Sequence, residues 1–319
     1  MPALNMAKHE ITCKRSTQFP NDWLKIWVSK NMWPESLIRE IIEKRCVIHV
    51  GSGMSCQSMG EDGNRPPSWK GLLETLRDKS QLAREHIELV NQFIAENKLL
   101  DAAEIIRLKG RAAEVSGEIK KKFIDSKLSP ADVHKQLVEI APKIVITTNY
   151  DTLIENALVS AGGIDSFTQF EFSRDGLLDA IRSPATILIK LHGCGKYPAS
   201  TILSRSDYFK LRKSHTSFFD IITAIYKLNT VLFLGCGIED PDINLILENN
   251  TIQTDSSNPS YALVGSLSYA AKLKDTIRSQ YNIDIITYEQ NNPNDHSGFS
   301  SAIKDLHEQV LTLRAKYQL

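Results

Sequence analysis

Short apolar runs alternate with longer amphipathic segments along most of this chain. The runs are four to six residues long and rich in Val, Ile and Leu, which is typical of buried strands. Segments with helical spacing separate them. This alternation predicts an α/β fold, with a mostly parallel, Rossmann-like sheet and helices on both faces. The predicted strands are Cys46–Val50, Ile144–Thr148, Thr186–Leu191, Thr230–Leu234, Tyr261–Val264 and Asp284–Thr287.

The stretch from about residue 70 to residue 141 breaks the alternation, because it has helical spacing but no strand pattern. Ser68 is a suitable N-cap for a helix that starts at Trp69. We therefore predict a helical insertion, about 70–141, within one domain that spans 31–319.

Residues 1–30 are predicted to be an N-terminal extension. Together with Trp33, its Trp23 and Trp27 are many aromatic residues for a tail. They either dock on the parent domain or form a contact with an oligomer or partner, where Trp is enriched.

Four polar or glycine-containing motifs follow four of the predicted strands directly. Ligands of open parallel sheets bind outside the carboxyl ends of the strands, so the motifs should meet at one edge. Glycines, an amide, a carboxylate and an imidazole in one place are typical of a nucleotide site that performs chemistry. The motifs are Gly51-Ser52-Gly53, Asn149-Tyr150-Asp151, His192-Gly193 and Gly235-Cys236-Gly237.

The first motif, Gly51 to Cys56, lets the backbone approach a diphosphate, whose oxygens its N–H groups can bind. It departs from the G-x-G-x-x-G fingerprint because the last position is Cys56. No acidic residue follows a second strand about twenty residues on, which disfavours an ordinary nicotinamide dehydrogenase. A tight turn without a ligand is the alternative.

Asn149 and Asp151 either cap the following helix or contact a ligand, and the Asn149 amide is suited to orient a water or a ribose hydroxyl. His192, after a strand and before a glycine, is a candidate for proton transfer near neutral pH, although lone histidines are often structural. His49 lies inside its strand and is interpreted as a core residue.

The segment from Gly235 to Asp242 provides a second glycine turn and then a helix start, with Asp240 as N-cap before Pro241. Asp242 either favours that helix start or binds a ribose diol, as carboxylates do in dinucleotide sites.

The composition and charge of the chain disfavour several classes of function. The chain has 319 residues, with 38 Lys and Arg against 38 Asp and Glu, so its formal net charge is zero. Neither direct nucleic-acid binding nor an acidic membrane surface is favoured. No apolar run is long enough to span a bilayer, and the N-terminus lacks a signal-peptide core, so we expect a cytoplasmic location. The five cysteines form no C-x-x-C pair, and no metal site is expected.

Together, these motifs resemble the sirtuin-like family, in particular its prokaryotic immune branch of NAD-cleaving proteins. Gly51-Ser-Gly-Met-Ser55 is similar to the family's Gly-Ala-Gly-Ile-Ser loop, and Leu191-His192-Gly193 to its catalytic histidine segment. Thr148 to Asp151 is similar to its Asn-Ile-Asp segment. Ser204 to Tyr208 and Gly235 to Asp242 also resemble blocks of the defence branch. The paired zinc cysteines and the Pro-Asp-Phe-Arg run of the deacetylases are missing, which favours plain NAD cleavage over protein deacetylation.

The resemblance implies NAD as substrate, no metal, and a role for each motif. Asn149 and His192 would be catalytic. The cofactor-binding residues would be Gly51, Ser52, Gly53, Ser55, Asp151, Gly235, Gly237 and Asp242.

As an enzyme, the chain would be an NAD⁺ glycohydrolase, a gated effector of antiphage defence that depletes NAD. Gating would come from homo-oligomerisation or from a separate ATPase translocase or other sensor. The alternatives are an NAD-dependent protein deacylase and a non-catalytic NAD- or ADP-ribose-binding assembly module. Hydrolysis and cyclisation both remain open.

Overall fold

A computed structural model describes residues 32–61, 63–236, 247, 259–292 and 295–317. Trp33–Leu319 forms one compact unit. The predicted extension at residues 1–30 lies outside the described residues.

The described strands form one seven-stranded sheet in the order β3-β4-β2-β1-β5-β6-β7, and every neighbouring pair is parallel. This confirms the predicted Rossmann-like α/β class. From β1 the chain passes to β2, then to the edge strand β3, and back to β4 between β2 and β3. It then crosses to β5 on the other side of β1, so the strand order reverses between β1 and β5. Ligands of open α/β sheets bind at such a switch point. The strands are β1 (Cys46–Val50), β2 (Ile144–Thr147), β3 (Phe167–Glu171), β4 (Thr186–Lys190), β5 (Thr230–Leu234), β6 (Ser260–Gly265) and β7 (Ile283–Tyr288).

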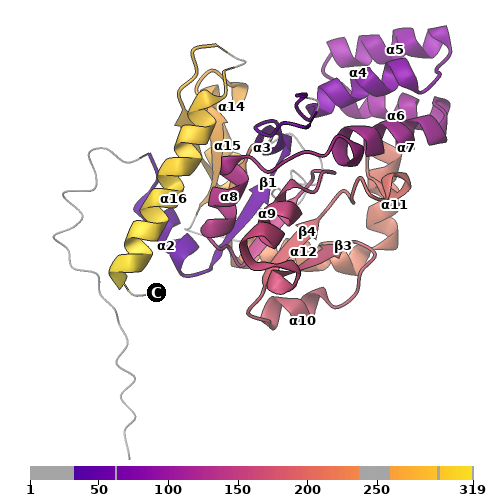
Figure 1. The fold of residues 1–319 in the computed structure, drawn as a ribbon. Coiled ribbons are helices and arrows are strands. Elements are labelled where there is room, and N and C mark those ends of the chain that lie inside the picture. Colours follow the sequence, from indigo (N-terminus) through magenta and orange to yellow (C-terminus); the bar gives the residue numbers. More distant parts are fainter. Residues whose placement is uncertain (1–31, 62, 237–246, 248–258, 293–294, 318–319) are drawn as a thin grey trace, which may run out of the picture. The chain divides into compact units, whose positions relative to one another are not determined.

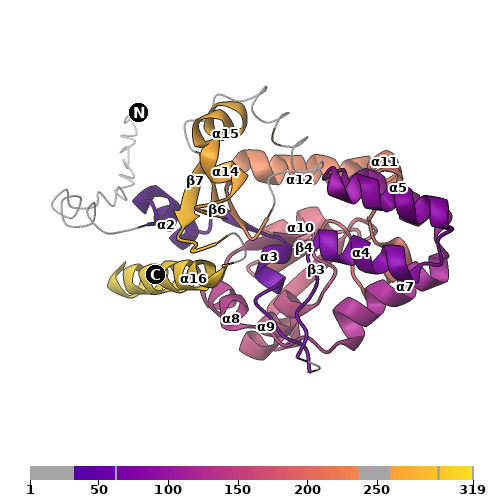
Figure 2. The same ribbon diagram turned by 90° about the horizontal axis from the view of Figure 1, so that it is seen from above.

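Helices cover both faces of the sheet (Figures 1 and 2). Alternate strand residues point to opposite faces, so Ile48 and Leu232 pack in one core and Val47 and Phe233 in the other. The first face carries α2 (Glu35–Ile42), α8 (Asp132–Glu139), α9 (Leu153–Gly162) and α16 (Ser297–Tyr317). The second carries α10 (Leu177–Arg182), α12 (Thr216–Leu228), α14 (Tyr269–Lys272) and α15 (Lys274–Tyr281).

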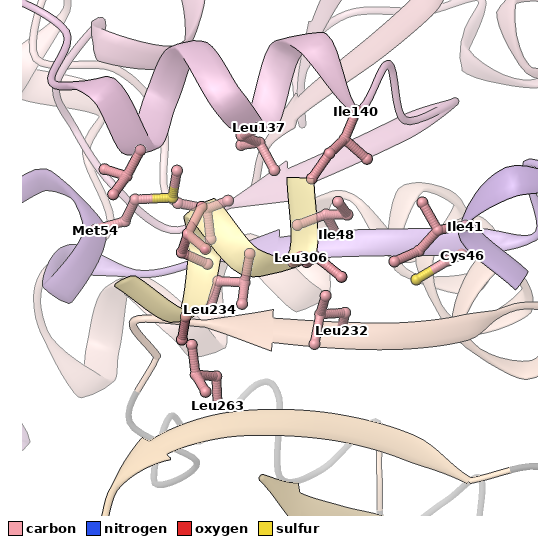
Figure 3. Packing of buried hydrophobic residues seen from close by; sticks show 14 of the residues in the cluster. Ile41, Cys46, Ile48, Met54, Leu137, Ile140, Leu232, Leu234, Leu263 and Leu306 are labelled. Atoms are coloured by element: carbon pink, nitrogen blue, oxygen red, sulfur yellow. The ribbon is translucent and has the colours of Figure 1, made fainter. Parts of the chain in front are cut away.

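The first core covers one face of the central strand β1, where Ile48 lies among side chains of α8, α16 and β5 (Figure 3). Trp33 belongs to this core. Its side chain is buried, and its indole N–H donates a hydrogen bond to the Ala302 carbonyl of α16 at 3.1 Å. Trp33 therefore docks on its own domain, whereas Trp23 and Trp27 lie outside the described residues.

The long segment between β1 and β2 contains two kinds of helix. Four helices that follow the short helix α3 (Ser52–Ser55), together with a π-helical turn, build a separate hydrophobic cluster and lie side by side at one end of the sheet (Figure 1). The last helix, α8, instead packs on α9 and α16 over the sheet. The Ser68 hydroxyl accepts a hydrogen bond from the Gly71 N–H at 3.2 Å, as its interpretation as an N-cap requires. We call the first group the cap: α4 (Trp69–Lys79), α5 (Arg84–Ala95), α6 (Leu99–Lys109), α7 (Ala112–Lys120) and η2 (Lys121–Asp125).

Three elements differ from the sequence prediction. The edge strand β3 was not predicted, because only Phe170 of its residues is buried. The short helix α3 (Ser52–Ser55) starts inside the glycine motif. The sequence also predicts one helix over 269–280, but the structure divides this region at Leu273 into α14 and α15. The remaining described elements are the 3₁₀ turns Ile164–Ser166 and Pro198–Ser200, and α11 (Arg205–Ser214).

Candidate functional site

The loops after β1, β2, β4 and β5 meet at the carboxyl ends of the strands, as the sequence predicts. A cavity of about 540 Å³ opens there, between these loops and the cap. Such a volume lies within the range of small-molecule sites in proteins. Six of the predicted site residues that the structure describes line it: Gly51, Ser52, Ser55, Asn149, Asp151 and His192.

The glycines of the first and fourth motifs bring two loops into backbone contact. The Gly51 N–H donates to the Leu234 carbonyl at 3.0 Å, and the Gly53 N–H donates to the Gly235 carbonyl at 2.9 Å. A Cβ at Gly51 would lie 2.5 Å from the Gly235 oxygen, and Gly235 itself has a φ of +65°. Because these glycines have no side chains, the two loops can pack backbone against backbone at the β1–β5 switch point. Gly53 and Gly235 are not among the described residues that line the cavity.

Asn149, Ser55 and Asp151 form a buried hydrogen-bonded cluster. The Asn149 amide donates to the Ser55 hydroxyl at 2.8 Å and to the Gly51 carbonyl at 2.9 Å. The Ser55 hydroxyl donates to the Asp151 carboxylate at 2.6 Å. Asp151, which precedes the N-cap Thr152, also accepts from the N–H of Leu153, the first residue of α9, at 3.0 Å, so it supports the helix start and lines the cavity at the same time. The two interpretations of Asp151 are thus compatible.

His192 follows β4 and is buried at the cavity wall. Its ring meets the Tyr208 ring edge-to-face, with centroids 5.1 Å apart. The backbone carbonyl of His192 accepts from the Ile202 N–H at 3.0 Å, which fixes the loop that carries the imidazole. His49 is fully buried in β1 and contacts the Tyr226 hydroxyl, in agreement with its interpretation as a core residue. Burial, together with the nearby His192, lowers the pKa of His49 to about 3.

The sequence did not predict that the cap contributes to the cavity. Trp69 and Leu72 of α4 and Phe123 of η2 supply apolar walls. Arg205 also lines the cavity and pairs with Asp101 of α6 at 3.1 Å. The three cap side chains lie far from the motifs in sequence, and apolar residues at helical spacing gave no signal that distinguishes a cavity wall from a core. Arg205 instead lies within the Ser204–Tyr208 block.

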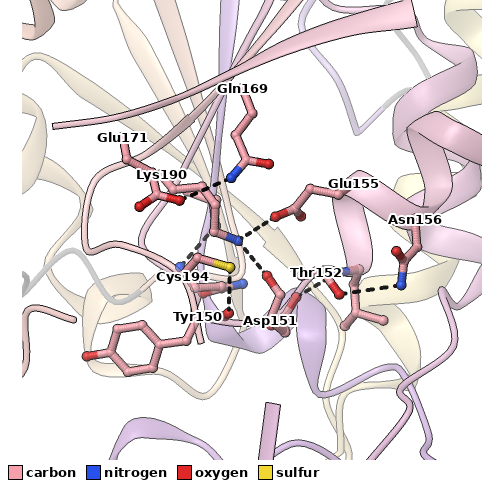
Figure 4. Close-up of polar contacts among 12 residues, drawn as sticks. Tyr150, Asp151, Thr152, Glu155, Asn156, Gln169, Glu171, Lys190 and Cys194 are labelled. Atoms are coloured by element: carbon pink, nitrogen blue, oxygen red, sulfur yellow. Dashed lines mark hydrogen bonds and ion pairs between the residues drawn. The ribbon is translucent and has the colours of Figure 1, made fainter. Parts of the chain in front are cut away.

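A buried charge beside the cavity was also not predicted. Lys190, the last residue of β4, donates to the Asp151 backbone carbonyl and pairs with Glu155 of α9 (Figure 4). The sequence signal was a lysine inside an otherwise apolar strand.

Two predicted site residues, Gly237 and Asp242, lie outside the described residues. Among the residues that the structure describes, no group of three or more His, Cys, Asp and Glu side chains could hold a metal ion. No helix in the described ranges is long and apolar enough to cross a bilayer.

Comparison with known proteins supports the family resemblance. A family described as the SIR2-like domain matches residues 143–286. The chain is 24% identical to "NAD(+) hydrolase ThsA" of Acinetobacter baumannii over 70% of this chain and 42% of that protein. It is 26% identical to the ThsA of Bacillus cereus over 66% of this chain and 40% of that protein. It thus spans about two fifths of the length of these two relatives.

A second kind of relative is "Defense-associated sirtuin 2" of Bacillus subtilis, 27% identical over 66% of this chain and 20% of that protein. Among solved structures, a complex of a Sir2 homologue with NAD aligns with a TM-score of 0.40 at 13% identity, over 88% of this chain and 94% of that one. The resemblance expected from the motifs is confirmed: residues 143–286 match a SIR2-like domain, and the chain is similar to bacterial proteins named NAD(+) hydrolase and defence-associated sirtuin.

Proposed function

We propose that this chain is an NAD⁺ glycohydrolase, which cleaves the bond between nicotinamide and ribose to give nicotinamide and ADP-ribose. The observation that carries the proposal is the cavity at the switch point, which Asn149, Asp151 and His192 all line. An amide, a carboxylate and an imidazole from two strand ends are groups that can hold a ribose and move a proton.

The reaction does not require an acid that protonates the leaving group. When the glycosidic bond breaks, its electron pair passes to the pyridinium nitrogen, so nicotinamide leaves as a neutral molecule. A water oxygen bonds to the ribose carbon, and His192 accepts the proton that this water loses. Asn149 positions the ribose or the water, and Asp151 supports the ribose. Paired carboxylates of the kind used by ordinary glycosidases are not needed.

The remaining motif residues would hold the rest of the substrate. Gly51, Ser52, Gly53 and Ser55 are assigned to the diphosphate, and the segment that contains Gly235, Gly237 and Asp242 to the adenosine half. The contact between the Gly51–Gly53 and Gly235 loops supports this division, because it brings the two segments together.

In its biological role the chain would be a gated effector that depletes NAD during phage infection. The names of its relatives, an NAD(+) hydrolase and a defence-associated sirtuin, support this proposal. Homo-oligomerisation, or a partner such as an ATPase translocase or another sensor, would supply the gate.

The direct test is to incubate the purified protein with NAD, dilute and concentrated, and to quantify nicotinamide and ADP-ribose by chromatography. Asn149→Ala and His192→Ala should abolish NAD loss while the circular dichroism spectrum stays unchanged. The matched controls are Asn156→Ala, at an exposed position of α9, and His86→Ala on α5, which should both remain active.

The possible results distinguish the proposed glycohydrolase from the alternative functions. Full activity in either site variant would overturn the assigned roles. Nicotinamide release that requires an acyl-lysine peptide would identify a deacylase. Tight NAD or ADP-ribose binding without turnover, even in an assembled or partnered state, would identify a binding module. A cyclic product in place of ADP-ribose would show that water is not the acceptor.

A further inference from the structure

Lys190 is a charged residue in a place where charges are rare. Its side chain is 0% exposed, and that of its partner Glu155 is 9% exposed. Lysine is almost never fully buried unless it is paired. Neither residue is among the described residues that line the cavity, so neither is available to contact a ligand there.

The Lys190 ammonium joins two elements. Its Nζ donates to Glu155 Oε1 on α9 at 2.8 Å and also to the backbone carbonyl of Asp151 (Figure 4). Burial by itself lowers the pKa of Lys190, but the charges of Glu155, Cys194 and Asp151 raise it above its usual value. The lysine therefore keeps its proton and both donated hydrogen bonds.

These hydrogen bonds lead directly to the proposed catalytic residues. Asp151, whose carbonyl Lys190 holds, accepts from Ser55 through its carboxylate, and Ser55 accepts from Asn149. Lys190 also lies two positions before His192 on the same strand end. One side chain thus connects the segment that carries the imidazole with the turn that carries the amide and the carboxylate. We call residues 149–151 the ribose turn.

Stability alone does not explain a buried ion pair. Removing two charges from water costs several kcal/mol per ion, and well-packed apolar residues in their place are often neutral or stabilising. A buried ion pair is better explained by a positioning role, in which it holds two segments in one relative geometry. We propose that Lys190 and Glu155 are positioning residues, which hold the ribose turn in register with His192; this inference rests on the proposed NAD-cleaving function.

The expected effect is on turnover rather than on substrate binding. A misplacement of about 1 Å can cost about 10²-fold in rate. The double variant Lys190→Met/Glu155→Leu removes both charges together and leaves no buried charge unpaired. We expect it to fold, to lower kcat about 10- to 100-fold, and to change KM for NAD and the affinity for ADP-ribose less than threefold.

Lys143 provides the matched control. It precedes β2 at the opposite end of the sheet, and its ammonium also donates to two backbone carbonyls, those of Ser183 and Ala185. Lys143→Met should keep wild-type kcat. All proteins are compared by nicotinamide release, calorimetric titration with ADP-ribose, and thermal unfolding followed by circular dichroism.

The results distinguish this inference from the proposed function. A wild type that remains inactive even in an assembled or partnered state refutes the proposed function and removes the basis of the inference. An active wild type with a folded double variant of unchanged kcat overturns the inference alone. Parallel loss of ADP-ribose affinity and turnover also overturns it, because the pair would then support the pocket in general. If the double variant does not fold, the single variant Glu155→Gln replaces it in the test. Its kcat should fall about 3- to 10-fold, and an unchanged kcat overturns the inference.

Discussion

Two buried histidines should make the folded protein sensitive to mild acid. His49 in β1 and His134 in α8 are both almost inaccessible to solvent. Burial, with His192 nearby, lowers the pKa of His49 from 6.5 to about 3. Burial also lowers the pKa of His134 from 6.5 to about 4, although the charge of Asp151 and the Ala131 backbone partly oppose that shift.

The sign of the effect follows from where protons bind. Between pH 6.5 and pH 4 the unfolded chain takes up a proton at each histidine, whereas the folded protein does not. The free energy of unfolding therefore falls as the pH falls through this window. One pKa unit corresponds to about 1.4 kcal/mol, so each histidine removes about 2 kcal/mol between pH 7 and pH 5. A loss of about 4 kcal/mol for the pair is large beside the 5–15 kcal/mol typical of folded domains.

The assay is urea denaturation at pH 7 and pH 5, applied to the wild type and to His134→Leu. Leucine has a similar volume and no proton to bind, so the variant should lose about 2 kcal/mol less than the wild type over this interval. Groups that titrate in both proteins cancel in the comparison. Equal losses in the two proteins would refute the assignment of acid sensitivity to His134.

Three further predictions concern packing and helix ends. Gly51→Ala should lower the free energy of unfolding by about 3 kcal/mol, since its Cβ would meet the Gly235 oxygen. Gly117→Ala, whose Cβ would have nothing within 4 Å, should raise the free energy of unfolding by about 0.5–1 kcal/mol. Urea denaturation measures both changes. Arg107→Met, which loses its bonds to Asp207 and the Thr201 carbonyl, should expose the cap to proteolysis at least tenfold faster, and an unchanged cleavage rate would contradict this. Ser68→Ala should cost about 1 kcal/mol in urea denaturation, and no cost would show that its contact with Gly71 does not cap α4.

The sequence predicted most of the sheet, because buried parallel strands are apolar on both faces. Cys46–Val50 and Thr230–Leu234 are buried at every position and coincide with the predicted strands. The edge strand β3 has one buried residue, and a polar segment such as Thr168-Gln169 gives no strand signal. The edge strand β3 is therefore missed for the same physical reason that central strands are found, whereas the other edge strand, β7, has three buried residues and was predicted.

The same reasoning explains what could be predicted of the site. Residues that follow a parallel strand share one sheet edge, so Asn149 and His192 could be placed together from sequence. The partners of Lys190 could not, because its contact with Glu155 depends on how α9 packs on the sheet. The walls supplied by the cap depend on tertiary packing as well, since apolar helix residues look alike in sequence whether they face a core or a cavity.

The central position of β1 has a consequence for synthesis on the ribosome. Its final partners are distant: the Cys236 thiol contacts the His49 carbonyl across 187 residues of sequence. At about 5–20 residues per second, β1 emerges about 10–40 s before β5 does. During that interval an apolar strand has no neighbour on the β5 side, which makes the nascent chain prone to aggregation and a client for chaperones. Slowed translation after β1 should therefore reduce the yield of soluble protein more than slowed translation after β5.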